Sequence, residues 1–171
     1  MSAAMSDPVA GAVPGPALWT QIPLVGAGAV VRQSDENGCG PACGEMLFQD
    51  RGIIIPQSMI SLTLPLPVTG GELASRMSVL AELAWLGGAL DLAEEPTWDL
   101  VACISASQRS WAALLEPHGP RHVGHWVVID DVSRERLVLV RDPVGRAYGI
   151  PMMEFLSLWR CAVVVMEKVA P

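Results

Sequence analysis

The sequence predicts an α+β domain, with helices in its first half and an antiparallel sheet in its second. Apolar residues recur at helical spacing after Thr69, whereas short Val-rich runs of strand-like composition follow His118. Helices followed by strands indicate segregated helical and sheet layers. With 171 residues, 51% of them apolar, and no internal repeat, the chain can bury one sizeable core.

The N-terminal stretch differs in composition from the rest of the chain. Residues 1–20 are rich in Ala, Gly, Pro and Ser, which predicts a flexible lead-in, and residues 21–171 are assigned to the domain. The apolar run Ile22–Val31 is short, and no Lys or Arg precedes Arg32. We therefore interpret this run as extended chain that enters the domain rather than as a signal peptide.

The first elements of the domain are predicted from local composition. Residues 29–33 are predicted to form a short strand, and residues 35–38 form a polar turn. Pro41 suits the first turn of a helix, where its missing N–H costs nothing, and this helix should run to about Gln49.

A second helix is predicted after an ambiguous, Pro-flanked segment at residues 56–64. Thr69 is its candidate N-cap, so Gly70-Gly71 is interpreted as a turn at the helix start. The helical spacing of apolar residues continues to about Leu86, and Gly87-Gly88 should stop the helix there.

The second half of the domain is expected to supply the sheet. A helix is predicted at 94–106, with a buried strand as the alternative, and another at 151–159. A hairpin turn is predicted near residues 133–135. Strands are predicted at 111–115, 126–129, 137–140 and 161–166.

Charge and composition exclude several classes of protein. The net charge is −7 and no cluster of Lys and Arg is present, which argues against a nucleic-acid partner. No apolar run reaches the length of about 18 residues that spans a bilayer, so no membrane span is expected. Four cysteines in a chain of this size favour a reducing compartment, so we expect a cytoplasmic protein, with export as an effector as the alternative.

The segment that opens the first predicted helix carries the most chemistry. Cys39 stands at the helix start, where free backbone N–H groups and the positive end of the helix dipole favour a thiolate. Gln33 precedes Cys39 by six residues and can return beside it to offer a side-chain N–H. A nucleophilic thiolate and an oxyanion hole, formed by Gln33 and the backbone N–H of Cys39, are two parts of an acyl-transfer site.

Two later residues can complete this site. His125 heads an apolar strand, and Asp142 lies 17 residues further on, at the end of the next strand. An antiparallel hairpin of this length can bring the carboxylate beside the imidazole and fix its tautomer. The predicted catalytic set is therefore Cys39, His125, Asp142 and Gln33, and it requires no cofactor and no metal.

These motifs in this order resemble the papain-like cysteine peptidases, and in particular the bacteriocin-processing peptidases that cleave after a double glycine. The matching segments are Gln33, Cys39-Gly40-Pro41-Ala42, His125-Trp126-Val127-Val128 and Asp142-Pro143. The resemblance covers about residues 29–167 and implies a papain-like fold and a Cys-His-Asp triad. Free-standing domains of this kind also resemble toxin or effector modules of larger bacterial proteins.

Three functions remain open at this stage. The first is a peptidase that acts on a leader peptide or on a target protein. The second is a Gln deamidase or acyltransferase, because the same triad serves these reactions. The third is a catalytically silent binding module. The expected partners are a peptide or protein substrate and, for a toxin, an immunity or inhibitor protein.

The remaining cysteines and tryptophans are interpreted mainly as structural. Cys43 is expected in the core, with a redox partnership with Cys39 as the alternative, and core positions are also expected for Cys103, Cys161, Trp126 and Trp159. Trp111 could line a cleft. A zinc site drawn from Cys39, Cys43, His122 and His125 is a weaker alternative, because its two pairs lie far apart in sequence.

Overall fold

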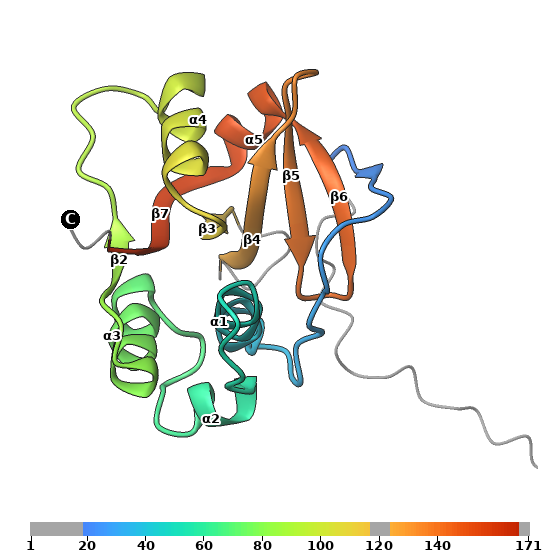
Figure 1. Cartoon of the computed structure of the whole chain (residues 1–171). Coiled ribbons are helices and arrows are strands. Elements are labelled where there is room, and N and C mark those ends of the chain that lie inside the picture. Colours follow the sequence, from blue (N-terminus) through green and yellow to red (C-terminus); the bar gives the residue numbers. More distant parts are fainter. Residues whose placement is uncertain (1–18, 117–123, 168–171) are drawn as a thin grey trace, which may run out of the picture.

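The computed structural model describes residues 19–116 and 124–167, which form one sheet with helices on both faces (Figure 1). The helices are α1 (Cys39–Gln49), α2 (Gln57–Ser61), α3 (Gly70–Ala81), α4 (Trp98–Ser107) and α5 (Met152–Leu158). The strands are β1 (Ile22–Pro23), β2 (Trp85–Ala89), β3 (Trp111–Leu115), β4 (His125–Val132), β5 (Leu137–Asp142), β6 (Arg146–Pro151) and β7 (Trp159–Met166).

The described strands form one antiparallel sheet in the order β1-β6-β5-β4-β3-β7-β2. At its centre, β4 and β5 are joined by the predicted hairpin, with Ile129 opposite Val140. The register places Val128 opposite Arg141, so the start of β4 and the end of β5 meet at one end of the sheet. The start of β4 carries His125, and the end of β5 carries Asp142.

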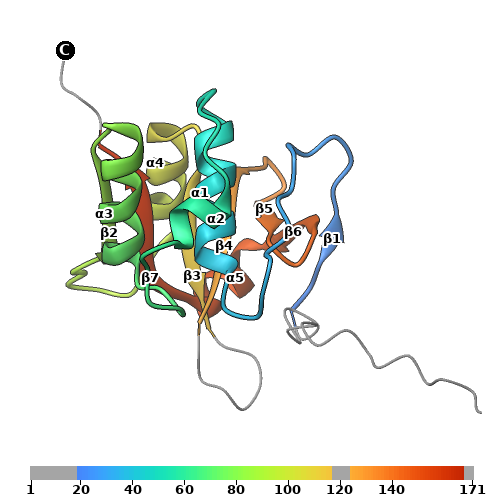
Figure 2. The same ribbon diagram turned by 90° about the horizontal axis from the view of Figure 1, so that it is seen from below.

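Two apolar clusters cover the two faces of the sheet. Helices α1, α2 and α3 pack on one face, over Trp126, Val128 and Val164. Helices α4 and α5 pack on the other face, over Trp111, Val127 and Val140. Figure 1 shows α4 above the strands and α1, α2 and α3 below them, and Figure 2, seen from below, has these three helices in front. This alternation along β4 is the period-two pattern of a sheet that is buried on both faces.

The N-terminus of α1 is set by close packing. Its N-cap is Gly38, which offers no side-chain acceptor to the helix. A Cβ on Gly40 would lie 2.3 Å from Val68 Cγ1, so only glycine lets the first turn approach the loop before α3. The nucleophile candidate Cys39 is thereby held against the segment around Val68.

Several predicted elements are confirmed, but the second helix is shorter than predicted. Thr69 caps α3 with a full capping box to Glu72, whereas the helix ends at Ala81 and Glu82 adopts a left-handed conformation (φ 54°). Residues 85–89 form the edge strand β2 on β7 instead of a helix end. The stop predicted at Gly87-Gly88 is wrong: a Cβ on Gly87 would lie 2.1 Å from Gly70 O, so glycine is required where β2 passes under α3.

The predicted strand at 29–33 is wrong, and the strand at Arg146–Pro151 was not predicted. Residues 29–33 have no strand partner, because side chains bond their backbone: Arg141 donates to Ala29 O and Gln57 donates to Arg32 O. The pairing with the sheet occurs earlier, where Ile22–Pro23 joins β6. In β6 the Gly and Pro residues hid the strand, since both weaken strand propensity.

Candidate active site

The structure brings the predicted Cys39, His125 and Asp142 together at the end of the sheet. Cys39 is the first residue of α1, His125 is the first residue of β4 and Asp142 is the last residue of β5. All three side chains are buried or nearly so, at 6%, 7% and 0% relative exposure. The Nε2 atom of His125 lies 2.8 Å from Asp142 Oδ1, which leaves Nδ1 as the ring nitrogen that faces the thiol.

The electrostatics of this cluster favour a charged imidazole. Burial lowers the pKa of His125, but hydrogen bonds to Asp142 and Cys39 and the charges of these two groups outweigh it and raise the pKa to about 10. For Asp142, burial raises the pKa, and the hydrogen bond and charge of His125 reverse this and lower it. An imidazolium beside a carboxylate and a cysteine is the arrangement that activates a thiolate.

Asp142 is held by two further groups that the sequence analysis missed. Tyr148 donates its hydroxyl to Asp142 Oδ2 at 2.6 Å, and Trp19 Nε1 lies 3.3 Å from the Tyr148 oxygen as donor. The backbone N–H of Val144 donates to Oδ1 at 2.9 Å. Burial and the charge of Asp142 raise the pKa of Tyr148, so this hydroxyl keeps its proton and remains a donor. Tyr148 lies on β6, the strand that the sequence did not predict.

Replacing Tyr148 by Phe is expected to weaken this support without removing the carboxylate. The buried hydrogen bond to a charged group should contribute about 1.5–3 kcal/mol to the free energy of unfolding at pH 7. Because the lowered pKa of Asp142 stabilises the fold fully above its unfolded pKa of about 3.9, and this contribution is lost as the pH falls through the lowered folded pKa, the loss should shrink as the pH falls under 4. Urea unfolding at pH 7 and pH 3 measures both values; an equal loss at both would show that only packing was changed.

Gln33 lies beside the start of α1, but its side-chain amide already donates a hydrogen bond to a nearby backbone carbonyl. Its Nε2 donates to Asp35 O at 2.7 Å, and its backbone N–H donates to Pro143 O at 2.8 Å. Its Oε1 is buried and has no hydrogen-bond partner. Because an amide nitrogen carries two N–H groups, one remains for a ligand.

A cleft of about 420 Å³ adjoins the thiol. Its walls carry few large side chains, because four glycines line it, and its larger apolar side chains include Val68, Leu114 and Trp126. The lining glycines are Gly70, Gly71, Gly88 and Gly124. The cleft therefore has room for an extended backbone with small side chains next to Cys39.

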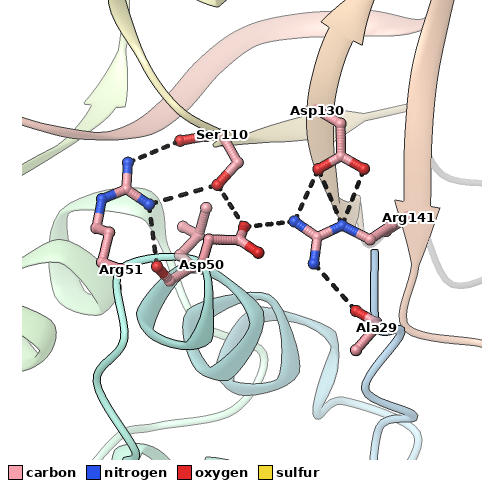
Figure 3. Close-up of polar contacts among 7 residues, drawn as sticks. Ala29, Asp50, Arg51, Ser110, Asp130 and Arg141 are labelled. Carbon is pink, nitrogen blue, oxygen red and sulfur yellow. Dashed lines mark hydrogen bonds and ion pairs between the residues drawn. The ribbon is translucent and has the colours of Figure 1, made fainter. Parts of the chain in front are cut away.

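A network of charges around a buried arginine lies beside the site, and Figure 3 shows its members. Arg141, the residue before Asp142, is 2% exposed and donates to Ala29 O at 3.0 Å. Its guanidinium also pairs with Asp130 of β4, with Nη2 2.7 Å from Oδ1, and with Asp50 at the end of α1. Ser110 donates to the same Asp50 carboxylate at 2.5 Å. Arg141 thus joins the helix of Cys39 to the strands of His125 and Asp142.

The other three cysteines and Trp111 differ in how far they are buried. Cys43 is fully buried, and burial together with the charge of Cys39 raises its pKa, so it is a core thiol. The prediction for Cys103 is wrong, since this side chain is exposed on α4, and Cys161 is only partly buried. The cleft role considered for Trp111 is also wrong: it is buried under α4, where its indole donates to Ser105.

The residues that the structure describes contain neither a metal-binding cluster nor a helix suited to crossing a membrane. Within residues 19–116 and 124–167, no group of three His, Cys, Asp or Glu side chains is arranged to hold a metal ion. Of the zinc ligands considered, His122 lies outside the described residues, as does His118. Among the helices that the structure describes, none has the length and apolar character that crossing a membrane requires.

The fold and the cluster define a papain-like domain: the helix that begins with Cys39 packs against an antiparallel sheet whose strands carry His125 and Asp142. Comparison with solved structures supports this. The peptidase domain of Streptococcus ComA, a bifunctional ABC transporter, has a TM-score of 0.65 at 12% identity and covers 82% of this chain and 98% of that domain. A Bacillus anthracis protein described as a C39-like peptidase has a TM-score of 0.66 at 12% identity, covering 89% and 100%. A double glycine motif protease in complex with its leader peptide has a TM-score of 0.60 at 14% identity, covering 88% and 99%.

The chain is also similar in sequence to part of a longer bacterial protein. Cysteine protease effector 1 from Escherichia coli O1:K1:H7 is 32% identical over 142 residues, which are 82% of this chain. The chain spans 27% of the length of that relative. No family model matches the chain. The predicted papain-like α+β fold is confirmed, and the predicted cysteine protease class agrees with both the sequence relative and the structural neighbours.

Proposed function

We propose that this domain is a cysteine peptidase that hydrolyses peptide bonds through Cys39, His125 and Asp142. The observation that carries the proposal is the buried contact between His125 and Asp142 beside Cys39, which raises the pKa of His125 to about 10. At neutral pH the imidazole is then protonated, and the positive charge of an imidazolium stabilises a thiolate formed beside it.

The proposed reaction uses each group at a stated atom. The Cys39 sulfur attacks the carbonyl carbon, and the oxyanion accepts from the free backbone N–H of Cys39 and from Gln33 Nε2. His125 Nδ1 gives its proton to the leaving amine as the C–N bond breaks, which leaves a thioester. His125 then takes a proton from water, the water oxygen attacks the thioester, and the C–S bond breaks to regenerate the thiolate.

The proposed substrate is a protein or peptide with small residues next to the scissile bond. The glycine-lined cleft supports this, and one structural neighbour is described as a double glycine motif protease. The relative of the chain is named an effector, which favours a target protein over a leader peptide. In this proposal the domain is the protease module of an effector.

A competition between two cysteines tests the activated nucleophile. Cys103 is exposed and Cys39 is buried at 6% exposure, so accessibility alone favours labelling of Cys103. We expect iodoacetamide at pH 6 to modify Cys39 at least tenfold faster, because alkylation proceeds through the thiolate and the charged imidazole of His125 favours that form at Cys39 only. Mass spectrometry of the two peptides measures the ratio.

The same sample links the thiol to hydrolysis. Wild-type protein should cleave members of a broad peptide library, and modification of Cys39 should stop cleavage. Faster labelling of Cys103, or cleavage that survives full modification of Cys39, would contradict the proposed function.

A further inference from the structure

The side chain of Gln57 forms a bridge across the backbone that carries Gln33. Its Nε2 donates to Arg32 O at 2.8 Å, and its Oε1 accepts from Ser34 N–H at 3.0 Å. The amide therefore bonds the residues on both sides of Gln33, as a peptide group of a neighbouring strand would. The two partners fix the amide orientation, because a carbonyl only accepts and an N–H only donates.

Gln57 is itself attached to the helix of the nucleophile. It is the first residue of α2, and its backbone N–H donates to Glu45 Oε2 of α1 at 2.7 Å. A continuous path of hydrogen bonds thus runs from α1 through Glu45 and Gln57 to the backbone of Gln33. The backbone N–H of Gln33 is tied to Pro143, next to Asp142. Gln33 is held from both parts of the site.

The segment around Gln33 depends on such support because it has no strand partner. Residues 27–33 lie outside regular structure, and Gln33 Oε1 is a buried acceptor without a hydrogen-bond partner. A buried unpaired amide oxygen is unfavourable, so other contacts must hold this side chain in place. An oxyanion donor must also lie within a few tenths of an ångström of its optimum to be effective.

We propose that Gln57 is a positioning residue that holds Gln33 in the oxyanion hole. The inference rests on the proposed function, since it assigns a support to the donor used there. It also predicts a specific kinetic signature. Acylation of Cys39 by an ester passes through an oxyanion, whereas alkylation by iodoacetamide forms the S–C bond as iodide leaves, without one. Loss of Gln57 should therefore slow acylation and spare alkylation.

The test compares Gln57→Leu with Gln108→Leu. Gln108 is a matched control because its amide also bonds one backbone residue twice, at Met166 N and O, both at 3.1 Å, at the far end of β7. The probes are p-nitrophenyl acetate, which acylates the thiolate and releases p-nitrophenolate, and iodoacetamide. Mass spectrometry of the Cys39 peptide gives both rates. Gln57→Leu is expected to slow acylation about tenfold and alkylation less than twofold, and Gln108→Leu to change neither rate.

A double substitution and an isosteric one complete the design. In a Gln33→Leu background, adding Gln57→Leu should change acylation less than twofold, because the two residues act through one donor. Gln57→Glu keeps the acceptor for Ser34 but turns a second acceptor towards the Arg32 carbonyl, so it should also slow acylation and spare alkylation, and it serves if Gln57→Leu does not fold. Equal losses of both rates, no loss of acylation, or full additivity with Gln33→Leu would overturn the proposal. A wild-type Cys39 no faster than Cys103 with either probe would overturn the proposed function itself, and the role of Gln57 with it.

Discussion

Replacing Asp142 by Asn is expected to lower peptide hydrolysis by about a hundredfold or more at pH 8. The amide oxygen can still accept from His125 Nε2, so the geometry is kept while the charge is lost. The hydrogen bond and charge of Asp142 are leading reasons why the pKa of His125 rises to about 10. Without the charge this pKa should fall towards its ordinary value of about 6.5, and the imidazole becomes neutral at pH 8.

The pH dependence of the hydrolysis rate should show the lowered pKa of His125 directly. For the wild type, activity should persist to about pH 9 and decline as His125 loses its proton near pH 10. In Asp142→Asn the alkaline limb should move down by more than one pH unit. The same pair should stabilise the fold fully between about pH 4 and 6.5: His125 loses its contribution as the pH rises from 6.5 through 10, and Asp142 loses its contribution as the pH falls through its lowered pKa.

A matched control is available on the adjacent strand. Asp131 of β4 is exposed and accepts from the N–H of the next residue, so Asp131→Asn makes the same chemical change outside the site. It should leave both the rate and the pH profile within twofold of the wild type. An Asp142→Asn enzyme with an unshifted alkaline limb would show that another group protonates the leaving amine.

The sequence could predict where three of the candidate site residues lie because each one stands at a locally recognisable boundary. Cys39 begins a helix, His125 begins a strand and Asp142 ends the next strand, so local patterns place them at element ends. The hairpin between β4 and β5 then converts sequence separation into spatial contact. Long-range packing was needed only to bring α1 to this end of the sheet.

The parts that the sequence could not predict depend on partners far away in the chain. β2 forms at Trp85–Ala89 because β7 offers an edge, although local periodicity continues the preceding helix. Tyr148 reaches Asp142 only once β6 has joined β5, and the Gly and Pro residues of β6 hide that strand. The backbone at 29–33 is satisfied by side chains from other elements, for which no local pattern exists.

Replacing Arg141 by Met is expected to destabilise the fold by about 3–5 kcal/mol at pH 7. The guanidinium is 2% exposed and pairs with Asp50 and Asp130, so its loss leaves two partly buried carboxylates without their cation. Met fills a similar volume, which separates the loss of charge from the loss of packing. Urea unfolding of Arg141→Met and wild type at pH 7 measures the difference.

The pH dependence distinguishes loss of the ion pairs from a packing defect. Burial already raises the pKa of Asp130 despite its bonds to Arg141, and removing the cation should raise it further. A carboxyl with a raised folded pKa destabilises the fold above that pKa and ceases to do so as the pH falls and it takes up a proton. The loss of stability in Arg141→Met should therefore shrink between pH 7 and pH 5, whereas a packing defect would cost the same at both.

Arg141→Lys keeps the charge but lacks the planar fork that reaches Asp50, Asp130 and Ala29 together. Its free energy of unfolding at pH 7 should lie between those of Arg141→Met and the wild type. A Lys variant as unstable as Met would mean that the hydrogen-bond geometry of Arg141, rather than its charge, joins α1 to the strands of the site.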